Sequence, residues 1–203
     1  MDNQESKNLP QKKSVILLWI LSIITLGIYG PVWYLKRKSE FDNLQTNKKL
    51  STKLIKAVLI LFVITLILRI LLLIISLTGG TENLISGEMG LATLGIILLV
   101  SIILSFIIAG ISITAFVLFI ILAFKTREIL NQTLENKKVT RKISGFFTFI
   151  FNFLYLQYEI NRIIEDREYE KRTGPWIIFI LLILLTIFSL IIQIYLSTPG
   201  IIS

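Results

Sequence analysis

The sequence contains no cysteine and no histidine, and only 17% of its 203 residues are charged. Without these two residue types the chain cannot form disulfides, thiolate nucleophiles, His-based triads or the usual zinc and haem sites. The acidic residues cluster in charged loops, with no paired-carboxylate motif and no phosphate-binding loop. We therefore expect no enzymatic activity, no metal and no cofactor.

Apolar residues are abundant instead, at 54% of the chain with a mean hydropathy of +0.79. Soluble proteins have roughly 45–50% apolar and about 25% charged residues. Here the apolar residues fall in long runs with few charges, which are typical of membrane spans. The composition predicts an all-α integral membrane protein.

Three runs fit transmembrane helices: residues 57–78, 91–124 and 175–196. The run 91–124 would be about 51 Å long as a helix, against roughly 30 Å of hydrocarbon. We expect one long, tilted helix, because a split at Gly110 would put the basic segment after it outside the cell. Residues 1–13 are expected to form a disordered polar tail and 14–200 a single membrane domain.

Two further apolar stretches, 14–35 and 143–158, contain helix breakers, and we call them the first and second breaker elements. Gly27, Gly30 and Pro31 are expected to turn the chain in the first, because Gly permits positive φ and Pro lacks an N–H. Asn152 is the corresponding weak point of the second. A polar stretch and one clean span follow each element, which suggests two weakly similar parallel repeats, 14–78 and 143–197, joined by the helix 91–124. Chance similarity in so apolar a chain is the alternative.

The positive charges predict the topology. Lys and Arg are enriched in cytoplasmic loops, and all cations except Arg69 lie in the N-terminal tail, 36–56, 125–142 and 162–172. Keeping these segments in the cytoplasm requires both breaker elements to enter and leave on one side, as re-entrant or interfacial helices. We thus expect three transmembrane helices in the plasma membrane, with a cytoplasmic N-terminus and an outer C-terminus. The alternative is five transmembrane helices.

Arg69 is the main polar candidate inside a span, where an arginine costs about 2.5 kcal/mol or more. Thr65 and Ser76 share its helix face, and Gln193 belongs to a polar stripe on the last span. These residues either line a polar path or are accommodated by snorkelling and helix packing.

The segment "YLQYEINR", residues 155–162, is the most distinctive polar cluster of the sequence. Gln157 and Asn161 share a helix face, as do Tyr158 and Arg162. One interpretation is an interfacial helix that satisfies its own side chains. The other is a docking surface for the first breaker element or for a lipid headgroup.

The stretches "TLGIYGPVW" and "YLQYEINR" together carry a family resemblance. The chain resembles the uncharacterised prokaryotic membrane family named domain of unknown function 4234. The resemblance implies this fold class and no known activity. The residues that match its motifs are Thr25, Leu26, Gly27, Ile28, Tyr29, Gly30 and Trp33, with Pro31 following the second glycine, and later Tyr155, Leu156, Gln157, Asn161 and Arg162.

These features lead to two functional hypotheses. The first is a small, non-catalytic polytopic protein that organises lipid or a membrane-protein partner through interfacial helices and a basic cytoplasmic face. Its partners would be anionic headgroups, a protein partner or further copies of the chain, and not nucleic acid. The alternative is a small oligomeric transporter or channel with Arg69 in its pathway.

Overall fold

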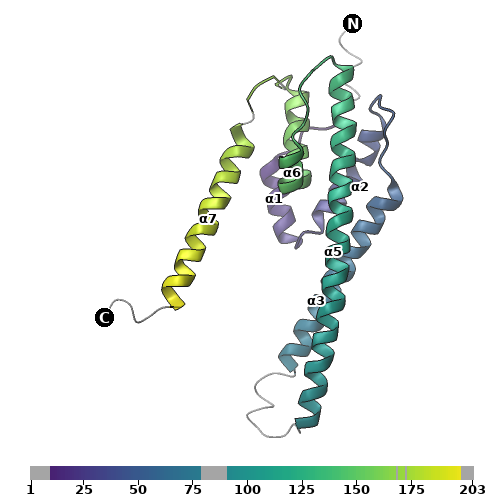
Figure 1. Cartoon of the computed structure of the whole chain (residues 1–203). Helices are drawn as coiled ribbons and strands as arrows, with labels where there is room; N and C mark the ends of the chain where they lie inside the picture. Colours follow the sequence, from purple (N-terminus) through teal and green to yellow (C-terminus); the bar gives the residue numbers. More distant parts are fainter. Residues whose placement is uncertain (1–9, 79–90, 168, 172, 198–203) are drawn as a thin grey trace. The chain divides into compact units, whose positions relative to one another are not determined.

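The computed structural model describes residues 10–78, 91–167, 169–171 and 173–197, and in these ranges it contains helices and no strand (Figure 1). The all-α prediction is confirmed for this part of the chain. The chain divides after residue 168 into two compact units, and α7 belongs to the second unit. The helices are α1 (Val15–Ile24), α2 (Tyr29–Asp42), α3 (Thr52–Thr78), α5 (Leu91–Asn136), α6 (Gly145–Ile164) and α7 (Thr173–Ser197).

Three of the described helices, α3, α5 and α7, are long and apolar enough to cross a membrane. They coincide with the three predicted spans and fit a multi-pass membrane protein. The run 91–124 lies within one continuous helix, α5, which extends through polar residues to Asn136. By contrast, α1 has 10 residues and is about 15 Å long, half of a hydrocarbon layer of roughly 30 Å.

The first breaker element turns between α1 and α2, at Leu26 (φ 50°) and Gly27 (φ 90°). Thr25 stabilises this turn, because its Oγ1 donates to Leu21 O at 2.8 Å and accepts from Tyr29 N at 3.0 Å. The turn is therefore made by local bonds and by one glycine in the left-handed region.

Gly30 and Pro31 do not form the turn, and this part of the prediction is wrong. Both residues lie in the first turn of α2, where a missing N–H costs little because it has no intrahelical partner. Gly30 instead permits close packing: a Cβ there would lie 2.7 Å from Cζ of Phe119 and 3.3 Å from Cε1 of Phe153.

The second breaker element forms α6, which is kinked at Asn152 (φ 47°, ψ −126°). Helical stretches lie on both sides of this residue, and asparagine is among the few non-glycine residues that visit positive φ. The weak point expected at Asn152 is thus the place where the helix breaks.

The two ends of the first breaker element lie close together. Gln11, just before α1, contacts Arg37 and Glu40 near the end of α2. The chain therefore returns, through α1 and α2, to the end of the unit from which it started (Figure 1).

The ends of the second breaker element also lie at that end of the first unit, which we call the basic end. Ile143 N donates to Asn131 Oδ1 in the last part of α5. After α6, Asp166 pairs at 3.5 Å with Lys137, which directly follows α5. α6 packs against this half of α5, α2 packs against α3 and α6, and α3 runs along α5 (Figure 1).

Candidate functional site

The two sequence motifs meet in a buried polar cluster, which we call the motif junction. Its first contact joins α2 to the kink of α6: the Tyr34 hydroxyl donates to Asn152 Oδ1 at 2.7 Å, and Asn152 Nδ2 donates to Phe119 O at 3.4 Å. Burial raises the pKa of the Tyr34 phenol well above its usual range, so the hydroxyl stays protonated and can donate. The kink of α6 is therefore bound to both α2 and α5.

The second contact of the motif junction is a chain of side-chain bonds. The Trp33 indole N–H donates to Gln157 Oε1 at 3.1 Å, and Gln157 Nε2 donates to Asn161 Oδ1 at 2.7 Å. Trp33 and Gln157 are fully buried, so each bond replaces hydration that the side chain lost on folding. Gln157 thus binds the first breaker element, as the docking interpretation of "YLQYEINR" expects, and it also bonds to Asn161 within its own helix, as the other interpretation expects.

Arg37 carries a buried positive charge at the edge of the motif junction. Its Nη1 pairs with Glu40 Oε2 at 2.8 Å, its Nη2 donates to Gln11 O at 2.5 Å, and its guanidinium lies 5.4 Å from the Trp33 ring. Burial lowers the pKa of Arg37, while the charge of Glu40 and then Tyr29 oppose that shift. The ion pair and the ring contact together compensate for the desolvated charge.

A second buried pair lies on α6, where Arg162 Nη1 is 3.7 Å from Glu159 Oε2. Arg162 Nη2 also donates to Arg167 O at 2.8 Å, and the guanidinium lies 5.6 Å from the Tyr158 ring. These contacts tie the end of α6 to the residues that follow it.

Two further predicted motif residues, Tyr155 and Tyr29, make contacts within their own segments of the chain. Tyr155 accepts from Ser144 N at 3.2 Å through its hydroxyl, which joins α6 to its own N-cap. The Tyr29 ring lies 6.0 Å below the ammonium of Lys36.

The polar candidates within the spans are not gathered into a site. Arg69 and Ser76 are exposed, and Thr65 is half-buried with a buried hydroxyl that has no partner in the described residues. Ser76 donates to Leu73 O on its own helix. Gln193 is exposed on α7, and its role stays a prediction, as does that of Arg69.

The described residues contain no group of three or more His, Cys, Asp or Glu side chains that could hold a metal ion. An open apolar hollow of about 460 Å³ lies along α5 beside Ser101, Ser105 and Ala109. Its lining comes from one helix and brings together no charged group.

Sequence reasoning missed Tyr34, Arg37 and Glu40. A signal for the first two was available, because the buried residues of α2 recur at helical spacing and place Arg37 on the same face as Trp33. The buried residues are Gly30, Pro31, Trp33, Tyr34, Arg37 and Phe41. The run of cations at 36–38 concealed the inward position of Arg37.

The comparisons with known proteins identify a family and nothing more specific. The model of the family described as Domain of unknown function (DUF4234) matches residues 13–132, more than half of the chain. This range includes the first motif and ends before the second, so the assignment of residues 155–162 to a family motif stays a prediction. No curated protein and no solved structure matches the chain.

Proposed function

The chain belongs to the DUF4234 family, and from this premise we propose that it is a non-catalytic membrane protein that organises anionic lipid at its basic end. One observation carries the proposal: each breaker element starts and ends at the basic end of the first unit. All described cations of this unit except Arg69 then share one side, as the positive-inside rule requires of a cytoplasmic face.

In this proposal the breaker elements are re-entrant and do not span the bilayer. The length of α1 supports this view, because about 15 Å of helix reaches only the middle of the hydrocarbon. Its exposed side chains are apolar and suited to lipid: Ile16, Leu17, Trp19, Ile20, Ile23 and Ile24. The N-terminus lies in the cytoplasm, α3, α5 and α7 span the bilayer, and the C-terminus lies outside.

The polar contacts of the motif junction would let non-helical backbone enter the bilayer. Backbone at membrane depth is tolerated only where protein or water satisfies it. The break at Asn152 is buried in protein, where its side chain bonds to the Tyr34 hydroxyl and to Phe119 O. At the first break the backbone itself is bonded, since Gly27 N donates to Ser22 O and Tyr29 N donates to Thr25 Oγ1. In this proposal the two breaker elements thus support the cytoplasmic face from within the bilayer.

The exposed cations of the basic end provide the contact with lipid headgroups. Lys53 and Lys56 lie on the first two turns of α3, and Lys125 lies on α5, all with exposed side chains. A cation near an anionic leaflet contributes about 1 kcal/mol. Three such residues therefore make a substantial preference for anionic over zwitterionic lipid.

Reconstitution in mixed vesicles tests the proposal. Energy transfer from the tryptophans to dansyl-phosphatidylglycerol should exceed transfer to dansyl-phosphatidylcholine, and the excess should fall as salt is added. The triple variant Lys53→Gln, Lys56→Gln and Lys125→Gln should lose most of the excess, whereas the matched triple change to Arg should retain it. Equal transfer to both lipids at low salt would show that the basic end does not organise lipid.

The alternative, a conduit through Arg69, gains no support from the described residues. Arg69 is exposed, and it makes no hydrogen bond or ion pair within the part of the chain that the structure covers. Flux through liposomes that contain the Arg69→Leu variant remains the direct test of that alternative.

A further inference from the structure

The four residues Pro10–Lys13, which we call the strap, lie across α2 and α6 and are bound through their main chain. At Gln11 the carbonyl accepts from Arg37 Nη2 at 2.5 Å, and the N–H donates to Glu40 Oε2 at 3.1 Å. Both polar groups of one peptide residue are therefore held by side chains of α2. These residues fall in the stretch that the sequence predicts to be a disordered tail.

Lys13, two residues further on, is bound in the same manner by α6. Its carbonyl accepts from Asn161 Nδ2 at 2.7 Å, and its N–H donates to Asn161 Oδ1 at 3.2 Å. Binding at alternate residues is the pattern of an extended peptide, in which every second residue presents its main chain to the same side. Such contacts are independent of the side chains that the peptide carries.

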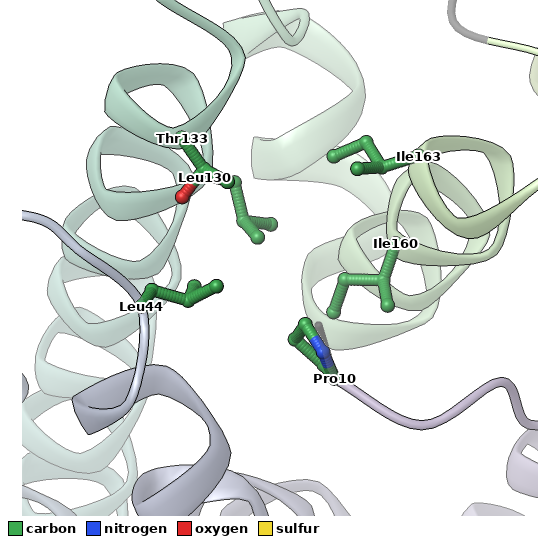
Figure 2. A pocket seen from close by; sticks show the side chains of 6 residues that line it. All are labelled: Pro10, Leu44, Leu130, Thr133, Ile160 and Ile163. Atoms are coloured by element: carbon green, nitrogen blue, oxygen red, sulfur yellow. The ribbon is translucent and has the colours of Figure 1, made fainter. Parts of the chain in front are cut away.

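Two side chains of the strap add specificity. Pro10 is buried, and with mostly apolar side chains of α5, α6 and the segment after α2 it lines a gap too narrow for a water molecule (Figure 2). Lys12 has an exposed side chain and forms an ion pair with Glu165. The other residues that line this gap are Leu44, Leu130, Thr133, Ile160 and Ile163.

The side chains of Arg37 and Asn161, which bind the strap, are also bonded to other side chains of α2 and α6. Arg37 Nη1 bonds to Glu40, and Gln157 Nε2 bonds to Asn161. Gln157 in turn is bound by Trp33 in the motif junction. Because none of these bonds involves the strap, the groove keeps its shape when the strap leaves, and α1 keeps its own N-cap at Ser14.

We propose that this groove is a binding site for an extended peptide that carries proline followed two residues later by a cation. The strap is its intramolecular occupant, and a segment of a partner protein with the same pattern displaces it. The physical basis is the division used by other extended-peptide sites, in which main-chain bonds supply affinity and side-chain pockets supply specificity. The groove does not depend on the lipid proposal, because no headgroup takes part.

The test uses the full chain in neutral detergent with a strap weakened by Pro10→Gly and Lys12→Gln. A fluorescent peptide with the sequence of residues 8–14, NLPQKKS, should bind this variant saturably by fluorescence anisotropy. The wild-type chain should bind at least about ten-fold more weakly, because its own strap competes at an effective concentration near millimolar. Absence of saturable binding to the weakened variant would overturn the proposal.

Two changes to the groove and one to the peptide check where the peptide binds. In the weakened background Asn161→Leu should abolish binding, and Asn161→Asp, which keeps only the acceptor, should weaken it about ten-fold. The matched change Asn136→Leu should have no effect, since that amide binds Gln45 O and not the strap. A peptide with Lys12→Glu should bind about ten-fold more weakly.

Three results would contradict the assignment. The first is equal binding of the peptide with the sequence of residues 8–14 and of its Lys12→Glu form. The second is undiminished peptide binding by a folded Asn161→Asp variant. The third is a dimer of the weakened variant that does not dissociate when peptide is added. The last result would make a second copy of the chain the occupant of the groove.

Discussion

The two breaker elements interrupt their helices in different ways. In the first, the turn at Gly27 depends on residues within the turn itself, with Thr25 bonded to Leu21 and Tyr29. In the second, Asn152 adopts a positive φ while its side chain binds Tyr34 and Phe119, which are distant in sequence. One break is thus encoded locally, and the other is held by tertiary contacts.

This difference has a consequence for stability. A mutation in the local turn removes a bond within that turn. A mutation at a break held by tertiary contacts also leaves buried groups of other helices without hydrogen-bond partners, which costs more. Mutations at Asn152 should therefore destabilise the protein more than mutations at Thr25.

The largest effect is expected for Asn152→Ala, at about 2–4 kcal/mol of unfolding free energy. The change leaves the buried Tyr34 hydroxyl without its acceptor, and it forces alanine to a φ of 47°. Denaturation in detergent micelles, followed by tryptophan fluorescence, measures the loss.

Thr25→Val is the matched control for this prediction, with an expected loss of about 1 kcal/mol. Asn152→Gly should fall between the two, because glycine removes the backbone strain but not the missing bonds. A loss at Thr25 that equals or exceeds the loss at Asn152 would show that both breaks are local.

A smaller effect is expected for Gly30→Ala, which tests the packing that brings α2 to the second break. The new Cβ would meet Phe119 at 2.7 Å, and overpacking of this kind costs about 1–3 kcal/mol. Thermal unfolding measures the change. Gly110→Ala is the control, because a Cβ at Gly110 meets nothing within 4 Å, and helix propensity alone should then stabilise the variant by up to about 1 kcal/mol.

The smallest effect expected is a release of the strap at low pH. It tests whether the ion pair between Lys12 and Glu165 holds the strap in addition to the main-chain bonds. The hydrogen bond from Lys12, and then that from Arg167, holds the pKa of Glu165 below its usual value. The contact is therefore complete above that usual value, near 4.5, and is lost as the pH falls through the lowered pKa. A nitroxide on Gln11→Cys should become more mobile over this range.

Glu165→Gln should remove the mobility change, because it replaces the carboxyl group that pairs with Lys12. Glu40, at the other end of the strap, is unchanged in this comparison. A transition that persists in Glu165→Gln would mean that other groups release the strap.

Much of the architecture could be predicted from local patterns. The three apolar runs predicted α3, α5 and α7, because length and hydropathy determine whether a helix suits a bilayer. Gly27 and Asn152 were located as breaks for a similar reason, since few residues tolerate positive φ. Resemblance at the first motif indicated the family, and the family match confirms it.

The sequence by itself determined helix content, the apolar spans and the positions of the two breaks, since these follow from properties of neighbouring residues. Only the tertiary structure decided that Trp33 binds Gln157, that Arg37 is buried and that the strap binds α2 and α6. These contacts join residues far apart in the chain, and a polar side chain can satisfy its bonds in water as well as in protein. Composition and spacing therefore do not show whether a polar side chain bonds to water or to another buried side chain. Only the packing of the folded chain decides this, because it excludes water from some side chains and not from others.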